Sequence, residues 1–125
     1  MLIDTDVIIW HMRGNEKARL SIEAVADPLI SIVTQMELVQ GLRNRNEQRA
    51  LHRFLDQRDM HVLTINEQIS QRALYLMEEW RLSHNMLMAD ALIAATAIEH
   101  GLPLLTANTK HYDYLPTLEV AKFQP

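Results

Sequence analysis

Short apolar runs alternate along this chain with longer stretches in which apolar residues recur at helical spacing. Runs rich in Leu, Ile and Val predict buried strands, and they lie at residues 1–3, 29–33, 61–65 and 102–106, with a shorter fifth at 118–121. Apolar positions three and four apart predict helices at residues 7–12, 16–26, 34–42, 46–57, 66–83 and 88–99. Alternating strands and helices favour right-handed crossovers. The pattern therefore predicts one three-layer α/β/α domain over residues 1–125, with a central parallel sheet of four to five strands.

Turn residues mark several of the predicted helix ends. Asn15 and Asn66 precede helices, where their side chains can accept a backbone N–H bond. Asp27 with Pro28 stops the second helix, and His100 with Gly101 supplies a glycine stop to the last one. These signals support the predicted boundaries.

Four acidic or amide residues lie at the predicted strand-to-helix junctions: Asp4, Glu37, Asp90 and Asn108. They are far apart in the sequence, but an open parallel sheet gathers residues at the carboxyl ends of its strands. Crowded carboxylates repel one another and raise each other's pKa values. Such a site needs a divalent cation, and Mg²⁺ or Mn²⁺ accepts oxygen ligands of this kind. The pattern favours a metal-dependent site that cleaves phosphodiester bonds.

Each junction residue also has a structural interpretation. Asp4 could cap the first helix, and Thr34 with Glu37 matches the capping box, which is the better interpretation of Glu37 in isolation. Asp90 could cap a helix that starts late, and Asn108 is an ordinary turn residue. Asp90 gives the sharpest functional signal because an unpaired carboxylate in its apolar surroundings would be strongly unfavourable.

Three neighbouring residues could assist such a site. Thr5 and Thr106 could orient waters or phosphate oxygens, although capping of the local backbone is the simpler role. Asp6 could act as a water-mediated ligand, or simply as an acid favoured in the first turn of a helix. The simpler role is the better interpretation of each residue alone.

A basic cluster follows the second junction. Arg43, Arg45, Arg49 and Arg53 are suited to phosphate contacts, and Lys110 lies in the loop after the fourth predicted strand. Charged helix faces are usually only solvated. The formal net charge of −4 argues against binding nucleic acid by bulk electrostatics, but it does not exclude a nuclease, because carboxylates of a metal site contribute to it.

Composition excludes several classes of protein. The chain has no cysteine, which excludes disulfide scaffolds, zinc–cysteine sites and thiol chemistry. Its six histidines lack the spacing of a metal-binding motif. No apolar run is long enough to span a bilayer, and the first residues lack the basic segment of a signal peptide. We expect a cytoplasmic protein with no membrane association.

Three segments together resemble the PIN domain, and within it the VapC-type toxin ribonucleases: LIDTDVII at 2–9, TQMELVQGL at 34–42 and DALIAATAIEHGLPLLTANTKHY at 90–112. The resemblance implies a PIN-like fold and a Mg²⁺- or Mn²⁺-dependent endoribonuclease. Asp4, Glu37 and Asp90 match the acidic ligands of the family by position. Asn108 falls where many members carry a fourth Asp, which implies one firmly held cation.

The resemblance also implies partners. The expected substrate is structured RNA such as tRNA or rRNA. A cognate antitoxin is expected to inhibit the enzyme by threading a peptide along the helices near Glu37, and a homodimer is common in the family.

Two alternatives stay open. A PIN-like fold could serve as a catalytically weak module that binds RNA or protein. A phosphorylated receiver domain has a similar length and acidic strand ends, but it requires an acceptor Asp after its middle strand, and here Asn66 and Glu67 follow residues 61–65.

Overall fold

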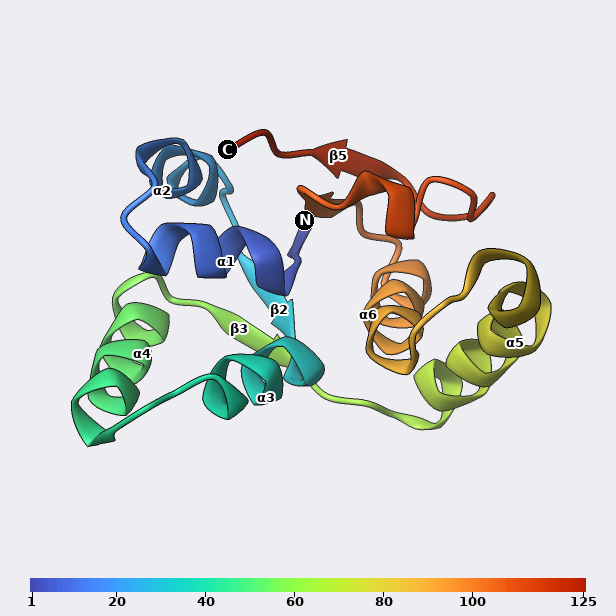
Figure 1. The fold of residues 1–125 in the computed structure, drawn as a ribbon, viewed down its shortest axis with the longest axis horizontal. Coiled ribbons are helices and arrows are strands. Elements are labelled where there is room, and N and C mark those ends of the chain that lie inside the picture. Colours follow the sequence, from blue (N-terminus) through green and yellow to red (C-terminus); the bar gives the residue numbers. More distant parts are fainter.

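Five strands form one parallel sheet at the centre of the molecule (Figure 1), and the computed structural model describes all 125 residues. The strands are β1 (Leu2–Ile3), β2 (Leu29–Ser31), β3 (His61–Leu63), β4 (Leu104–Thr106) and β5 (Val120–Lys122). Their order is β3-β2-β1-β4-β5, and Leu2 pairs with both Leu29 and Leu104. The winding direction therefore reverses between β1 and β4, the kind of position where open α/β sheets carry their functional crevice.

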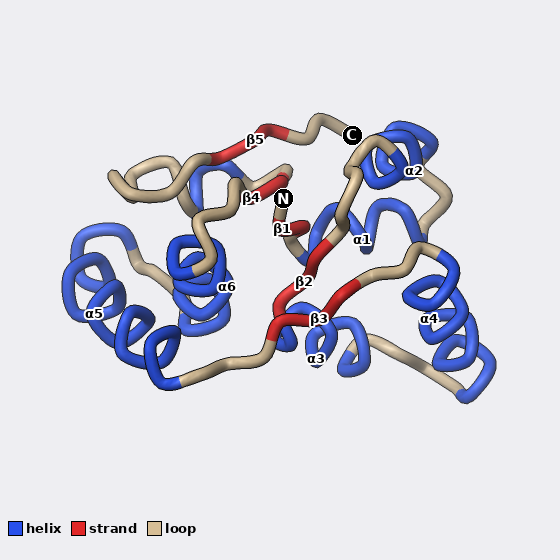
Figure 2. The backbone as a smooth tube through the Cα atoms, turned by 180° about the vertical axis from the view of Figure 1, so that it is seen from behind, coloured by secondary structure: helices blue, strands red, loops and turns tan.

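Six helices and one 3₁₀ turn surround the sheet. They are α1 (Thr5–Met12), α2 (Glu16–Glu23), α3 (Ile32–Gln40), α4 (Arg45–Gln57), α5 (Glu67–His84), α6 (Met88–Glu99) and η1 (Thr109–His111). Figure 2 shows α5 and α6 on one side of the strands and α1, α2 and α4 on the other. No helix combines the length and the apolar character that crossing a bilayer requires.

Neighbouring strand residues point to opposite faces of the sheet, because side chains alternate along a strand. Leu2 and Leu104 belong to the apolar cluster that contains the buried residues of α5 and α6. Ile3 and Leu105 belong to the second cluster, with the buried residues of α1, α2 and α4. Both faces are thus covered, and the predicted three-layer arrangement is confirmed.

Several predicted helix ends are confirmed by their hydrogen bonds. The side chain of Asn15 accepts from the Ala18 amide at 2.9 Å, and that of Asn66 accepts from the Ile69 amide at 2.9 Å. Gly101 lies just after the end of α6 with φ +62°, a left-handed conformation that favours glycine.

The predicted start of α3 is wrong by two residues. The sequence predicts a strand to Val33 and a capping box from Thr34 to Glu37, but β2 ends at Ser31, whose hydroxyl accepts from the Val33 amide at 3.0 Å. Ile32 and Val33 are β-branched and favour a strand, yet Ser31 caps a helix that begins at Ile32. Thr34 and Glu37 therefore lie inside α3 and cap nothing.

Smaller differences concern the ends of other elements. Helix α2 ends at Glu23, before the predicted stop at Asp27 and Pro28. Strand β3 ends at Leu63 instead of residue 65, and β5 spans Val120–Lys122 instead of 118–121.

Candidate active site

Asp4 lies at the reversal point of the sheet, between the end of β1 and the start of α1. It caps α1, since its Oδ1 accepts from the Thr5 amide at 2.8 Å. Its Oδ2 accepts from the Thr106 hydroxyl at the end of β4, also at 2.8 Å. Only 5% of Asp4 is exposed. The capping role is confirmed, but Asp4 also places a buried carboxylate between two neighbouring strands.

The surroundings of Asp4 favour its protonated form. Burial raises the pKa of Asp4 to about 7, and the nearby negative charges of Asp6 and Asp90 act in the same direction. Hydrogen bonds from Thr106 and from the Thr5 amide oppose this effect without cancelling it. No Lys or Arg side chain is bound to this carboxylate, so a cation from outside the chain would stabilise its charged form.

Asp90 lies in the first turn of α6, where the helix is capped by Leu87 without a side-chain hydrogen bond. The alternative that Asp90 is a helix cap is therefore wrong. Its Oδ1 accepts from the hydroxyl of Tyr112 at 3.1 Å, and its Oδ2 lies 3.1 Å from Nδ1 of His111. Both partners come from the turn that follows β4, so Asp90 ties α6 to that turn.

Glu37 reaches the site through Thr5. The Thr5 hydroxyl lies 2.7 Å from Oε1 of Glu37 and 2.9 Å from the hydroxyl of Thr34, and these bonds join α3 to the first residue of α1. Thr5 and Thr106 therefore connect acidic side chains across the fold. The Thr106 hydroxyl also accepts from the Asn108 amide at 3.0 Å, so the expected capping of the local backbone is confirmed for Thr106. It is wrong for the Thr5 hydroxyl, whose partners are both side chains of α3.

Asp6 holds the turn that carries Asn108. Its Oδ2 accepts from the amides of Ala107 and Asn108 at 3.0 Å each, while its Oδ1 is buried without a hydrogen-bond partner. Burial raises the pKa of Asp6. Asp6 does lie in the first turn of α1, as expected. Asn108 is exposed, and its side chain does not cap the following turn.

The donor atoms of this region fit a hard divalent cation. Asp4, Asp6, Glu37 and Asp90 offer only carboxylate oxygens, the ligands that Mg²⁺ and Mn²⁺ prefer. The unpartnered Oδ1 of Asp6 and the raised pKa of Asp4 both indicate uncompensated negative charge. In their present conformations, however, no three His, Asp or Glu side chains converge closely enough to hold an ion. A cation would have to compete with the hydrogen bonds just described.

Tyr112 is the site residue that the sequence does not reveal. A buried aromatic after an apolar strand predicts a core position, and nothing local indicates a bond to an acid 22 residues earlier. His111 is recognisable in the sequence only as a loop residue close to Asn108. Its contact with Asp90 likewise depends on the tertiary fold.

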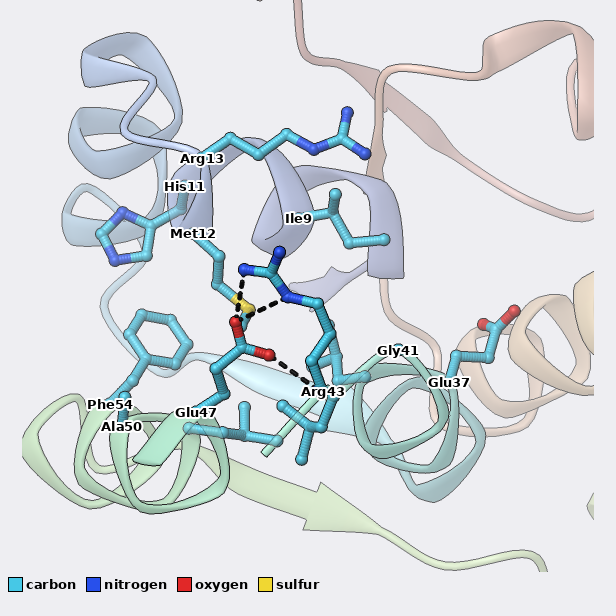
Figure 3. A pocket seen from close by; sticks show the side chains of 13 residues that line it. Ile9, His11, Met12, Arg13, Glu37, Gly41, Arg43, Glu47, Ala50 and Phe54 are labelled. Carbon is cyan, nitrogen blue, oxygen red and sulfur yellow. Dashed lines mark hydrogen bonds and ion pairs between the residues drawn. The ribbon is translucent and has the colours of Figure 1, made fainter. Parts of the chain in front are cut away.

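A groove of about 760 Å³ lies between α1, α3 and α4. Ile9 and Met12 line it from α1 and Phe54 from α4, and Figure 3 shows Glu37 at one end of it. An ion pair between Arg43 and Glu47, with N–O separation 2.7 Å, lies on its wall (Figure 3). We call it the α1–α3–α4 groove; it leads from an apolar surface to one of the site carboxylates.

Of the predicted basic residues, only Arg43 lines this groove. Arg45, Arg49 and Arg53 line a shallow depression on the outer face of α4, together with Gln48 and His52. Arg43 is exposed but paired with Glu47, and Lys110 is exposed in η1.

The chain is similar to known proteins over nearly its whole length. The profile of the PIN domain family matches residues 1–114. Ribonuclease VapC10 of Mycobacterium tuberculosis is 37% identical over 123 residues, which cover 95% of this chain and 90% of that protein. Ribonuclease VapC1 of Methanocaldococcus jannaschii is 30% identical over 117 residues, covering 92% and 80%.

Solved structures also match this chain over nearly its whole length. A toxin–antitoxin complex from Klebsiella pneumoniae contains a chain that matches with a TM-score of 0.82 at 29% identity, covering 97% of this chain and 95% of that chain. VapBC2 from Rickettsia felis, bound to a DNA fragment from the promoter, matches with a TM-score of 0.83 at 19% identity, covering 98% of both chains; this likeness shows the fold alone. The family profile and the identity to VapC ribonucleases show that the chain belongs to the PIN domain family and is of the VapC type.

Proposed function

We propose that this protein is an endoribonuclease that hydrolyses phosphodiester bonds in structured RNA such as tRNA or rRNA. In this proposal, Asp4, Glu37 and Asp90 hold Mg²⁺ or Mn²⁺. Residues 1–125 form the single domain that carries the site. The observation that carries the proposal is the buried carboxylate of Asp4 at the reversal point of the sheet, whose pKa is raised to about 7 without a cationic side chain beside it. The likeness to proteins named ribonucleases supports the same activity.

Bound at these carboxylates, a divalent cation supplies electrostatic stabilisation of the charge that develops on the phosphate. The residues of the chain do the rest. Thr5 keeps Glu37 close to the cap of α1, where a carboxylate can accept the proton of the attacking water. Asn108, with its exposed amide, orients that water. Asp6 and Thr106 hold the turn that carries Asn108 in place.

RNA contacts are proposed for the exposed basic residues. Arg45 and Arg49 lie on the outer face of α4, and Lys110 is exposed in η1 next to His111, which contacts Asp90. Arg43 can exchange its partner Glu47 for a phosphate, because an exposed ion pair is weak in water. Guanidinium groups suit this task because they bind phosphate oxygens in pairs.

We further propose that the protein is the toxin of a toxin–antitoxin pair and forms a homodimer. The α1–α3–α4 groove combines an apolar lining with Glu37 at its end, which suits an antitoxin peptide that carries a basic side chain toward the acidic site. The matching chain from Klebsiella pneumoniae comes from a toxin–antitoxin complex, and this supports the proposal.

A second candidate function is a module that binds RNA or protein without cleaving it. One observation favours it: no three acidic or histidine side chains converge on an ion position as they stand. A site of this kind could bind RNA while turning over slowly or not at all.

Cleavage of a mixed tRNA and rRNA pool, with and without Mg²⁺ or Mn²⁺, distinguishes the two. We expect discrete metal-dependent products from the wild type and none from Asp4→Asn. The matched control is Asp113→Asn, which removes the same charge from an exposed position in the loop after β4 and should cleave normally. A folded, antitoxin-free, metal-loaded wild type that yields no products would favour the binding module.

A further inference from the structure

The hydroxyl of Tyr112 is the most deeply buried partner of Asp90. Tyr112 is 0% exposed, and its hydroxyl oxygen lies 3.1 Å from Oδ1 of Asp90. It follows η1 directly, and its backbone amide bonds to the carbonyl of Thr109. The backbone that leaves β4 thus places a tyrosine hydroxyl against an acid of α6.

The ring of Tyr112 is fixed independently of this contact. It belongs to the apolar cluster that contains Ala91 and Ala94 of α6 and Leu104 of β4. Interiors are packed as densely as organic crystals, so a ring held in this way has little freedom to move. The hydroxyl therefore presents a rigid donor to Asp90.

The hydroxyl can act only as a donor in this position. Burial raises the pKa of Tyr112, and an ionised carboxylate offers only acceptors, so the hydroxyl donates to Oδ1 of Asp90. Hydrogen bonds to a charged acceptor are stronger than neutral ones. The contact thus restricts the rotation of the Asp90 carboxylate and keeps its Oδ1 hydrogen-bonded to Tyr112.

The second oxygen of Asp90 has a more replaceable partner. Oδ2 lies 3.1 Å from Nδ1 of His111, whose side chain is 49% exposed. An exposed imidazole can move into solvent, whereas the buried ring of Tyr112 cannot. Oδ2 is therefore the oxygen that remains available to a cation.

We propose that Tyr112 is a positioning residue of the metal site: its hydroxyl holds Oδ1 of Asp90 so that Oδ2 is presented to Mg²⁺ or Mn²⁺. This inference rests on the proposed function, in which Asp90 is a ligand. Partners that orient a ligating side chain typically change metal affinity by about 10- to 100-fold when removed. Tyr112 contributes by orienting a ligand and makes no contact with the cation itself.

The variant Tyr112→Phe keeps the ring and removes only the hydroxyl. Its matched control is Tyr114→Phe. The Tyr114 side chain is half-buried and stacks on His84 with ring centroids 4.1 Å apart. Burial and the charge of Asp90 raise the pKa of Tyr114 too, so the control lies in the field of the same carboxylate without bonding to it. Asp90→Asn completes the set.

Binding of Mn²⁺ is measured for all four proteins by titration calorimetry and by the electron paramagnetic resonance spectrum of the bound ion. We expect Tyr112→Phe to bind Mn²⁺ roughly ten-fold more weakly than the wild type with an altered spectrum. Tyr114→Phe should bind as the wild type does, and Asp90→Asn should lose the site. Thermal unfolding of the metal-free proteins shows whether each variant is folded.

The outcomes separate the two proposals. If Asp90→Asn loses Mn²⁺ while Tyr112→Phe binds it as the wild type does, the role of Tyr112 is overturned and the metal site stands. If Asp90→Asn binds Mn²⁺ normally, the ligand assignment of the proposed function is overturned as well. Equal weakening in Tyr112→Phe and Tyr114→Phe would also overturn the inference, because it would point to a general effect on the packing of the turn after β4.

Discussion

Acidic side chains behave differently in two regions of this molecule. At the reversal point of the sheet, burial raises the pKa values of Asp4 and Asp6, and no Lys or Arg is bound to either. On the surface, Arg19 pairs with Glu16 and lowers its pKa, and Arg58 together with Arg19 pairs with Glu23 and lowers its pKa. Glu16 and Glu23 thus have cationic partners within the chain, whereas Asp4 and Asp6 have none.

The difference points to function because surface pairs need no special arrangement, whereas uncompensated buried acids reduce stability. Strongly perturbed carboxylates in a crevice are typical of functional sites. Under the proposed function, a divalent cation or the basic side chain of an antitoxin would supply the compensating positive charge. His111 is the one ionisable base bound to the cluster, and it is half exposed.

The largest effect expected from this contrast is a dependence of stability on pH. The pKa of Asp4 is about 7 in the folded protein and near 3.8 when unfolded, so between these values the folded state binds more protons. Stability of the metal-free protein should therefore fall as the pH rises from about 4 to 7, by a few kcal/mol at most. Asp6, with its pKa also raised, acts in the same direction.

Chemical denaturation at pH 5 and pH 8 in the presence of a chelator measures this loss. The variant Asp4→Asn should unfold with a smaller pH dependence and be more stable than the wild type at pH 8, although we expect it to lose RNA cleavage. Mg²⁺ should raise the stability of the wild type at pH 8 and leave that of the variant nearly unchanged. If the metal-free wild type were more stable at pH 8 than at pH 5, the raised pKa values of the buried acids would be contradicted.

The sequence predicts the fold well because hydrophobic spacing and turn residues act locally. The order of strands and helices follows from that spacing, and Asn15 and Asn66 cap the helices that they precede. The start of α3 is not predicted because Ile32 and Val33 are residues typical of a strand. The hydroxyl of Ser31 instead accepts from the Val33 amide and caps a helix there. One side-chain hydrogen bond there outweighs the local preference.

The candidate site is only partly predictable, because the tertiary fold determines which residues its side chains contact. The junction pattern draws attention to Asp4 and Asp90, whose catalytic roles stay predictions. It does not reveal that Glu37 bonds to Thr5 instead of capping its own helix. Nor does it reveal Tyr112, whose partner lies 22 residues away in sequence. Contacts of this kind depend on how α6 packs against the turn after β4.

A smaller effect, on RNA binding, is expected from Arg45 and Arg49 of α4, which form no ion pair. They are surface cations without an acidic partner, the counterpart of the paired surface acids. The double variant Arg45→Ala and Arg49→Ala should raise KM for RNA several-fold and leave kcat unchanged, because these residues lie apart from the acids. The slope of log affinity against log salt should decrease by about one for each arginine that no longer binds a phosphate. Arg72→Ala, which removes a cation paired with Glu99, is the control and should leave KM unchanged. A fall in kcat would place α4 closer to the chemistry than the proposal allows.

The smallest effect should come from the surface ion pairs themselves. Arg19 bonds to Glu16 and Glu23, yet its side chain is 38% exposed, so water and salt screen both pairs. Arg19→Ala should lower the unfolding midpoint by no more than about 2 °C, the range of an ordinary surface substitution in a domain of this size. Glu23 keeps Arg58 at 2.9 Å, which limits the loss further. If Arg19→Ala lowered the midpoint by as much as Asp4→Asn raises it at pH 8, paired surface acids would influence stability as strongly as the buried ones. The raised pKa of Asp4 would then no longer single out the reversal point of the sheet as the functional region.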